Sequence, residues 1–307
     1  MSEIEFNGRV AIVTGAGGGL GRQHALALAR RGAKVLVNDL GGALDGSGGS
    51  VSAAQAVVDE IKAAGGEALA NGASVTDFEA VQAMVQQAVD AWGRVDILVN
   101  NAGILRDKSF TKMEMTDFKL VVDVHLMGAV HCSKAVWPIM NAQKYGRIVM
   151  TTSSSGLYGN FGQANYGAAK MALVGLMQTL SIEGAKNDIR VNCLAPTATT
   201  RMTEALFPPA MLEAFAPEAV VPAMLVMAAE NAPNRTILCA GAGTFEAAHV
   251  TLTQGAYIGI GDHAPEELAA RLAAVTERAG EQVPQSGNAQ GTNEVNKGMA
   301  AKAGKGA

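Results

Sequence analysis

The 307-residue sequence has few charged side chains, since only 17% of its residues are Asp, Glu, Lys or Arg and the net charge is -4 at pH 7. It has no basic stripe, which argues against nucleic acid or an anionic membrane surface as the main partner. Long hydrophobic runs are also missing, because no stretch approaches the roughly 20 apolar residues that a spanning helix needs. The sequence therefore predicts a protein that binds small molecules and has no membrane span.

Cysteine is scarce, with only three residues, Cys132, Cys193 and Cys239, and no C-x-x-C pair. The last two lie in apolar runs typical of buried strands, so all three are interpreted as structural thiols and no metal site is expected. The first ten residues, MSEIEFNGRV, are acidic and lack the apolar core of an export signal. We therefore expect a cytoplasmic protein.

Short β-branched runs alternate with helical patterns along most of the chain. The runs interpreted as strands lie at residues 9–14, 34–38, 67–75, 95–99, 148–150, 189–194 and 236–239. Alternation of this kind implies right-handed crossovers and a parallel sheet with helices on both faces. The sequence predicts an α/β protein with one doubly wound parallel sheet of about seven strands.

The same pattern predicts one folded domain, residues 1–280, followed by a tail. Within the domain, residues 202–229 are rich in Met and Phe and suit either a substrate lid or core packing. Residues 264–279 have the apolar period of an amphipathic helix. Residues 281–307 have almost no large apolar side chain, so they cannot offset the entropy of ordering and are predicted to be a flexible tail.

A glycine-rich loop follows the first strand. Residues 14–21, TGAGGGLG, place small residues where a backbone must approach a pyrophosphate, and the next helix directs its N-terminus at that charge. The predicted contacts are Gly15, Gly17, Gly19, Leu20 and Gly21.

The second strand ends at Asp39, where a carboxylate can accept both ribose hydroxyls of an adenosine. The alternative is a turn cap before Gly41 and Gly42. A carboxylate in the first role repels a 2′-phosphate, so the predicted cofactor is NAD rather than NADP.

The chemistry is predicted to start at the end of the buried strand 148–150, which delivers a hydroxyl cluster, residues 151–155, to the edge of the sheet. Tyr166 and Lys170 follow, four residues apart at the start of a helical pattern, so they share one face. An ammonium one turn from a phenol lowers the phenol pKa and allows it to act as a general acid or base. The alternative is an ordinary solvated helix pair.

Other polar groups fall after neighbouring strands. Asn101, Ala102 and Gly103 follow the fourth strand, where they line an adenosine pocket or form a plain β-turn. Thr197 and Thr199 follow the sixth strand, where hydroxyls can meet a nicotinamide amide. His125, in the long helical pattern of residues 111–138, is either a satisfied core or surface histidine or a member of a proton relay.

Jointly these motifs resemble the short-chain dehydrogenase/reductase family over about residues 6–245. The resemblance rests on TGAGGGLG, Asp39, NNAG at 100–103, a serine ahead of the tyrosine, YGAAK and VNCLAP. It implies a Rossmann-type fold and NAD-dependent hydride transfer. By position, it implies that Tyr166 is the acid/base, that Lys170 lowers its pKa and holds the nicotinamide ribose, and that Ser153 binds the substrate oxygen.

Within the family the sequence is most similar to a branch that contains the (3R)-hydroxyacyl-CoA dehydrogenase part of peroxisomal multifunctional enzymes. The same branch includes bacterial relatives described as 17-beta-hydroxysteroid dehydrogenases. The resemblance therefore implies a (3R)-hydroxyacyl-CoA as the leading substrate, a hydroxysteroid as the alternative, and, remotely, a dinucleotide-sensing protein without catalysis.

Several departures from the family pattern affect the site, including Thr197 in place of the glycine that usually follows Pro196, and Arg201 where a threonine is common. His125 stands where an asparagine is usual, and Ser74 stands where an acid is usual. Ser74, Val75 and Pro196 complete the predicted cofactor contacts. The predicted substrate contacts are Ser153, Leu157, Tyr158, Phe161, Met202 and Phe207.

Finally, the resemblance and an unusually wide apolar helix surface both predict a homodimer or homotetramer. The helices concerned are residues 111–137 and 164–184, and small residues on the second permit close approach. The alternative is a monomer in which residues 202–229 or the C-terminal helix cover that face.

Overall fold

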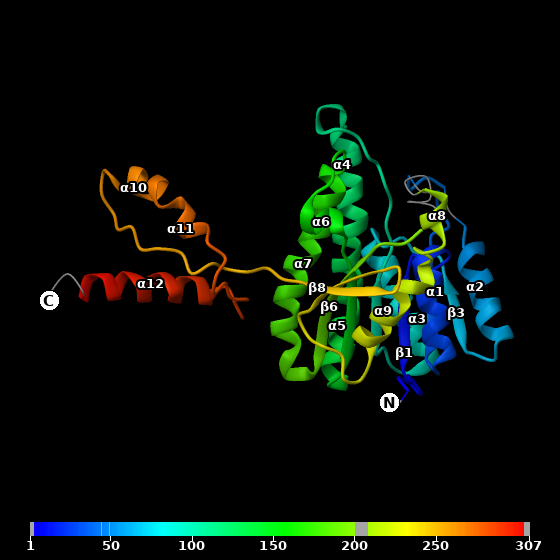
Figure 1. Cartoon of the computed structure of the whole chain (residues 1–307). Coiled ribbons are helices and arrows are strands. Elements are labelled where there is room, and N and C mark those ends of the chain that lie inside the picture. The colour runs from blue at the N-terminus through cyan, green and yellow to red at the C-terminus, as the bar shows by residue number, and fades with distance from the viewer. Residues whose placement is uncertain (1–2, 44, 49, 200–207, 304–307) are drawn as a thin grey trace. The chain divides into compact units, whose positions relative to one another are not determined.

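The computed structural model describes residues 3–43, 45–48, 50–199 and 208–303. The chain divides into two compact units, Met1–Ala247 and Ala248–Ala307. Figure 1 shows the strands and most of the helices in the first unit. In the described ranges, no helix combines the length and the apolarity that crossing a bilayer requires.

The first unit is built on one sheet that has eight strands among the described residues, in the order β3-β2-β1-β4-β5-β6-β7-β8. Every pairing from β3 to β7 is parallel. The strands are β1 (Val10–Thr14), β2 (Lys34–Asn38), β3 (Ala68–Asn71), β4 (Ile97–Asn100), β5 (Gly146–Thr151), β6 (Ile189–Pro196), β7 (Ile237–Gly241) and β8 (Thr244–Ala248). The predicted doubly wound parallel sheet is confirmed, with one edge strand, β8, beyond the seven expected.

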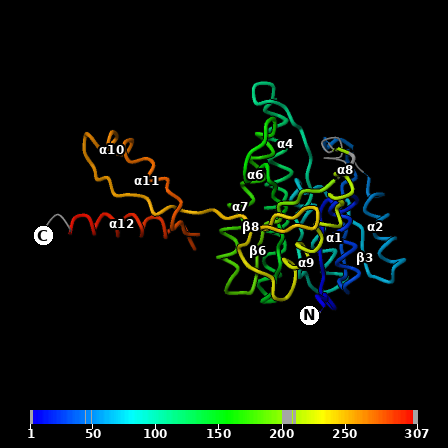
Figure 2. Tube along the Cα trace, in the orientation of Figure 1, coloured from blue at the N-terminus to red at the C-terminus, as the bar shows by residue number. Residues whose placement is uncertain are grey.

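Helices cover both faces of this sheet. On one face α1 (Gly19–Arg30) packs against α2 (Ser52–Ala63) and α9 (Val221–Ala228). On the other face lie α3 (Phe78–Trp92), α5 (Gly128–Gln143) and α7 (Ala164–Gly184). The tube in Figure 2 shows α2 beside the edge strand β3, which it contacts. Because both faces are covered, the central strands β1, β4 and β5 have no exposed residue and are mostly apolar.

The long helical pattern before β5 is not one regular helix. It consists of η1 (Phe110–Lys112), α4 (Met115–Val122), a π-helical segment η2 (Asp123–Met127) and α5. A π-helical segment inserts an extra residue into the turn and commonly lies at functional sites. It places the His125 side chain in the interior, where it is 3% exposed.

The segment 202–229 lies partly outside the described residues, which resume at 208. Its described part contains α8 (Pro209–Leu212), η5 (Pro217–Val220) and α9. Met224 and Met227 of α9 are fully buried in the core on the α1 and α2 face. The second half of the segment therefore serves core packing, and a lid role for the rest stays a prediction.

The second unit differs from the expected helix and tail. The helix expected at 264–279 is present as two short ones, α10 (Ala264–Ala270) and α11 (Leu272–Thr276), separated at Arg271. Asn288–Ala303 forms α12, where a flexible tail was expected, and none of its residues is buried. A helix can form without burying a large apolar side chain, and the flexibility of this segment stays a prediction.

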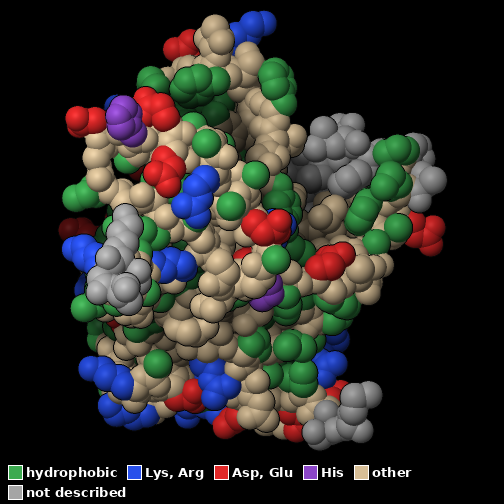
Figure 3. Space-filling model, turned by 60° about the vertical axis from the view of Figure 1, so that its left-hand side comes forward, with side chains coloured by type: hydrophobic (Ala, Val, Ile, Leu, Met, Phe, Trp, Pro, Cys, Tyr) green, Lys and Arg blue, Asp and Glu red, His purple; other side chains and the backbone are tan. Residues whose placement is uncertain are grey.

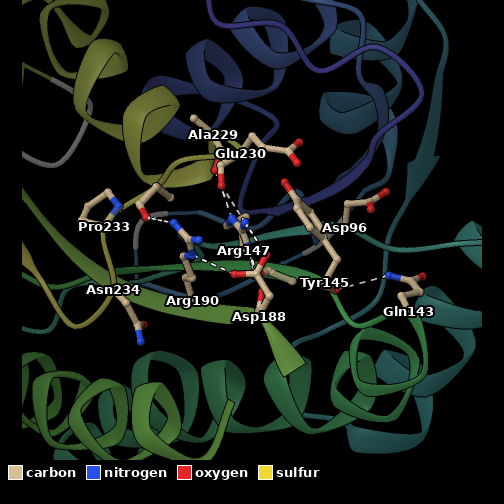
Figure 4. Close-up of polar contacts among 12 residues, drawn as sticks. Asp96, Gln143, Tyr145, Arg147, Asp188, Arg190, Ala229, Glu230, Pro233 and Asn234 are labelled. Atoms are coloured by element: carbon tan, nitrogen blue, oxygen red, sulfur yellow. Dashed lines mark hydrogen bonds and ion pairs between the residues drawn. The ribbon is translucent and has the colours of Figure 1, made fainter. Parts of the chain in front are cut away.

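A buried arginine closes the amino edge of the sheet. Arg147, at the start of β5, is fully buried, and its guanidinium donates hydrogen bonds to the carbonyl oxygens of Asp188, Ala229 and Glu230 at 2.6, 3.0 and 2.7 Å. Figure 4 shows it between these residues and the ring of Tyr145. Arg147 therefore has a structural role at the amino ends of β5 and β6. In open parallel sheets ligands bind at the carboxyl ends of the strands, so the site is expected at the opposite edge.

Candidate functional site

The glycine loop after β1 is packed so tightly that side chains are excluded. Gly15 has φ +62°, and a Cβ there would lie 2.7 Å from the Cα of Ala102. A Cβ on Gly17 would lie 2.8 Å from the carboxyl carbon of Asp39. Gly21 packs against the Gly15 carbonyl in the same way. The loop therefore brings backbone amides to the N-terminus of α1, an arrangement that suits a pyrophosphate.

Asp39 lies directly beside this loop. One of its carboxylate oxygens accepts the Gly17 N–H at 2.8 Å and the other accepts the Gly41 N–H at 2.6 Å. The side chain is half-buried, and a carboxylate has about four acceptor positions, so two remain for ribose hydroxyls. Asp39 can therefore cap the turn and bind ribose hydroxyls at the same time, so the two predicted roles are compatible.

The segment after β4 supports the loop from the other side. The side-chain amide of Asn101 donates to the carbonyl oxygens of Thr14 and Gly15, both at 3.0 Å. The Thr14 hydroxyl in turn accepts the N–H groups of Asn101 and Ala102. This geometry gives the side chain of Asn101 a structural task, and its contact with a cofactor stays a prediction.

The remaining predicted cofactor contacts lie at the same edge of the sheet. The Ser74 hydroxyl pairs with the Thr76 hydroxyl at 2.8 Å, and Val75 is buried with its carbonyl bonded to His131. The Thr197 N–H donates to the Ala240 carbonyl at 2.8 Å, just beyond Pro196 at the end of β6. The Thr199 hydroxyl donates to the Leu212 carbonyl at 3.1 Å. These contacts fix the loops at the edge of the sheet.

The structure brings Ser153, Tyr166 and Lys170 together. Ser153 follows β5 and caps α6 (Ser154–Tyr158), where its hydroxyl accepts the Ser155 N–H at 3.2 Å. The Tyr166 hydroxyl forms a hydrogen bond with Ser153. The Lys170 ammonium lies 5.5 Å from the centre of the Tyr166 ring. The four-residue spacing thus places both side chains on the face of α7 that meets the end of β5.

Electrostatics differ from the expectation that Lys170 lowers the pKa of Tyr166. Burial raises the pKa of Tyr166, the hydrogen bond from Ser153 lowers it, and the charge of Asp107 raises it. Burial also lowers the pKa of Lys170 to about 7. Because the amine is only partly charged near neutrality, the Ser153 hydroxyl is the group that favours the phenolate.

Lys170 is held by the end of the neighbouring strand. Its amine donates to the Thr151 carbonyl at 2.5 Å, and the Thr152 hydroxyl donates to the Lys170 carbonyl at 2.7 Å. The side chain is 3% exposed. These backbone contacts fix the amine beneath the Tyr166 ring.

His125 joins the cluster from the π-helical segment. Its ring meets the Tyr166 ring edge-on, with centroids 5.1 Å apart, and its Nε2 lies 3.1 Å from the Ile104 nitrogen and 2.8 Å from the Ile104 oxygen. Nδ1 is buried with no hydrogen-bond partner within the described residues. Burial, and next the charge of Lys170, hold the pKa of His125 well below its usual value. His125 is therefore a neutral imidazole next to the phenol.

The structure describes some of the predicted substrate contacts and not others. Tyr158 and Phe161 follow Ser153 along the chain and are 72% and 89% exposed, and Leu157 is half-buried beside them. The Tyr158 hydroxyl is hydrogen-bonded to the Cys239 thiol of β7. Met202 and Phe207 lie outside the described residues. An exposed aromatic surface next to Ser153 is compatible with an apolar substrate.

Sequence reasoning missed Asn165, and it considered Arg106 only as a basic residue for a CoA substrate. Asn165 is fully buried, and its side-chain oxygen accepts the Tyr166 N–H at 2.7 Å. Its amide donates to the Arg106 carbonyl at 3.1 Å. Asn165 lies beyond Gln163, the N-cap residue of α7, so no capping signal identifies it, and its bond with Arg106 depends on the tertiary fold.

Comparisons with known proteins agree with this geometry. A family model described as short chain dehydrogenase matches residues 9–209. The peroxisomal hydratase-dehydrogenase-epimerase of Saccharomyces cerevisiae is 56% identical over 228 residues, which are 74% of this chain and 25% of that protein. The chain thus spans about a quarter of the length of this relative.

Solved structures are also similar. Full-length peroxisomal multifunctional enzyme type 2 from Drosophila melanogaster has a TM-score of 0.79 at 36% identity, covering 97% of this chain and 50% of the other. A 7α-hydroxysteroid dehydrogenase solved with NADH and a 7-oxo bile acid has a TM-score of 0.70 at 30% identity, covering 78% and 95%.

Proposed function

The chain belongs to the short chain dehydrogenase family, and we propose that it catalyses the NAD-dependent interconversion of a secondary alcohol and a ketone on a lipid-type substrate. The observation that carries this proposal is the cluster of Ser153, Tyr166 and Lys170 at the carboxyl edge of the sheet, beside the glycine loop. The leading substrate is a (3R)-hydroxyacyl-CoA.

The residues of the cluster divide the work. Tyr166 accepts the proton of the substrate hydroxyl at its phenolic oxygen during oxidation and returns it during reduction. Ser153 hydrogen-bonds the same substrate oxygen, and Lys170 holds the nicotinamide ribose. When NAD is bound, its nicotinamide supplies the hydride acceptor. His125 completes the site as a neutral imidazole, with its free Nδ1 available to hold a water molecule in a proton relay.

The residues at the glycine loop fit a dinucleotide. A Cβ at Gly15 or Gly17 would occupy space beside Ala102 or Asp39, so the backbone there can approach a pyrophosphate closely. Asp39 keeps acceptor positions for ribose hydroxyls. The solved relative that contains NADH supports the same cofactor for this chain.

NADP is expected to be a poor cofactor. Asp39 would face the 2′-phosphate in a partly desolvated site, where like-charge repulsion costs on the order of a few kcal/mol. Efficiency with NADP should therefore be about 100-fold lower than with NAD, and Asp39→Asn should narrow that ratio. Steady-state kinetics with both cofactors measure it, with Asp59→Asn on the exposed face of α2 as the control. Equal efficiency of NAD and NADP in the native protein would contradict this assignment.

Two substrate classes compete. The hydroxyacyl-CoA is supported by the relatives whose names describe multifunctional and hydratase-dehydrogenase enzymes. A hydroxysteroid is supported by the 30% identical structure solved with a bile acid. Incubation with NAD and a panel of (3R)- and (3S)-hydroxyacyl-CoA thioesters and hydroxysteroids, followed by NADH absorbance, separates them. Turnover of the (3R)-thioesters supports the proposal, turnover of steroids alone supports the alternative, and no turnover supports a dinucleotide sensor.

We also propose that the protein is a homodimer or homotetramer. Met127 of the π-helical segment and Met171 and Ile182 of α7 are 38%, 40% and 51% exposed. Gly175 and Ala168 of α7 are exposed as well and allow close approach of a second helix. In the space-filling view, hydrophobic side chains reach the surface in several places between charged ones (Figure 3).

Light scattering tests the assembly. We expect a mass at least twice 31.5 kDa, and Ile182→Asp should shift the protein toward the monomer because a charge would be buried in the interface. Val226→Asp, on the similarly exposed outer side of α9, should leave the mass unchanged. A native mass near 31.5 kDa that persists as concentration rises would contradict the proposal.

The cytoplasm is the compartment that we propose for this protein. The three cysteines are free thiols, and Cys132 and Cys193 are buried, which suits a reducing compartment such as the cytoplasm. Several relatives are named peroxisomal, so the peroxisome is the alternative.

A further inference from the structure

A short connection between β4 and η1 contacts two parts of the site that are far apart in the sequence. We call residues 104–106 the linking segment. On one side it meets the glycine-rich loop that follows Asp39; we call the described part of this loop, residues 40–43 and 45–48, the adenosine-side loop. On the other side it meets the residues that surround Tyr166.

The contact with the adenosine-side loop has an apolar and a polar part. A Cβ on Gly46 would lie 3.3 Å from the Ile104 side chain, so the loop backbone rests on that side chain. The Arg106 Nε donates to the Asp45 carbonyl at 2.9 Å. The loop follows Asp39, whose carboxylate accepts the Gly41 N–H, so the position of the loop is tied to the predicted ribose site.

The contact with Tyr166 runs through two side chains. The Ile104 backbone meets the His125 ring, which packs edge-on against the Tyr166 ring. The Arg106 carbonyl accepts a hydrogen bond from Asn165, whose side-chain oxygen accepts the Tyr166 N–H. Asn165 is fully buried, so loss of either bond would leave a buried polar group unpaired.

The Arg106 guanidinium is anchored between the two sides. Its Nη1 donates to the Asp117 carboxylate of α4 at 2.6 Å while Nε binds the loop. Asp117 is 8% exposed. Lys108 also reaches Asp117, at 3.7 Å, but has no hydrogen bond or ion pair with the described residues of the loop. A planar guanidinium can make both contacts in a fixed geometry, which a single ammonium cannot.

We propose that Arg106 is a positioning residue that joins the adenosine-side loop to the acid/base Tyr166, so that binding of the adenosine end of the cofactor steadies the catalytic tyrosine. This inference rests on the proposed dinucleotide binding. It assigns to the glycine-rich loop, otherwise a surface insertion, a role in the reaction. The role is exerted through the linking segment and Asn165 rather than by contact with the substrate.

Hydrogen–deuterium exchange of the full chain, with and without ADP-ribose, tests the connection. ADP-ribose contains the adenosine end of NAD and lacks the nicotinamide. In the native protein it should slow exchange both in residues 15–21 and in residues 164–170. In Arg106→Gln it should still protect residues 15–21 but no longer protect residues 164–170. Lys108→Gln keeps the guanidinium and should behave as the native protein.

Kinetics give a second measurement. Arg106→Gln should lower kcat about tenfold, because small displacements of a catalytic group cost one to two orders of magnitude, while KM for NAD changes less than about twofold. Arg106→Lys preserves the charge beside Asp117 and serves if the glutamine variant unfolds; it should show the same loss of protection.

The possible outcomes distinguish failure of the proposed function from failure of this inference alone. Failure of ADP-ribose to bind the native protein would overturn the proposed function together with this inference. Binding that protects residues 15–21 but never residues 164–170 would overturn this inference alone. So would equal protection in the native protein and both Arg106 variants, or an equal loss of kcat in Lys108→Gln.

Discussion

Tyr166→Phe is expected to lower kcat for alcohol oxidation at least about 1,000-fold, because the phenolic oxygen is the group that accepts the substrate proton. Binding of NAD should persist, since the ring and the α7 backbone remain. The pH profile of the native protein should rise with pH toward the Tyr166 pKa, which burial raises above its ordinary value. Calorimetry of NAD binding and steady-state rates measure the two effects.

Tyr145→Phe is the matched control for this substitution. Tyr145 is buried, whereas Tyr166 is half-buried, and Tyr145 lies at the amino edge of the sheet, where its ring packs under Arg9 and Arg147 at 3.7 and 4.1 Å. Removal of the Tyr145 hydroxyl should leave kcat within about twofold of the native value, because the change is far from the candidate site. Retention of more than a few per cent of activity in Tyr166→Phe would remove the acid/base role from this tyrosine.

Lys170→Met should abolish activity and yet stabilise the folded protein at pH 7. The lysine is buried, and its pKa falls from 10.5 to about 7 on folding. Each pKa unit corresponds to about 1.4 kcal/mol, which sets a ceiling near 5 kcal/mol. Loss of the hydrogen bond to Thr151 offsets about 1 kcal/mol, so the expected net gain has a ceiling of roughly 4 kcal/mol.

The sign of the pH dependence follows from the depressed pKa. Between pH 7 and 10.5 the unfolded chain binds a proton that the folded chain has released, so the native protein loses stability as pH falls through this window. The advantage of Lys170→Met should therefore be largest at pH 7 and smaller near pH 10. Urea unfolding at both pH values measures it, with Lys62→Met as a surface control. A variant less stable than the native protein at pH 7 would show that the amine is better solvated than its burial implies.

The central sheet could be predicted from the sequence because each of its strands is a recognisable hydrophobic run. Strands β1, β2, β4, β5 and β6 are buried runs bounded by glycine or polar residues, and both faces are covered, so hydrophobicity alone identifies them. The edge strand β8 was missed because four of its five residues are exposed and show no alternation. The strand expected at 67–75 ends at Asn71, where the side chain bonds Asn38 and Gln87 rather than continuing the ladder.

The candidate site was predictable where spacing alone determines proximity. Tyr166 and Lys170 share a face because they are four residues apart on one helix, and the glycine loop is local to one strand and one helix. His125 could be placed on a helix, but the π-helical segment that directs it inward has no sequence signature. Arg106 contacts Asp117 and Asp45, which are 11 and 61 positions away in the sequence, and such pairings depend on the tertiary fold.

The central claim is that this site moves a hydride from a carbinol carbon to NAD. The most direct test is incubation of the protein with NAD and a (3R)-hydroxyacyl-CoA that carries deuterium on its carbinol carbon, followed by mass spectrometry of the nicotinamide product. The account predicts NADH that contains one deuterium per turnover, and none in Tyr166→Phe. A product without deuterium, or no product with any secondary alcohol of the panel, would contradict it.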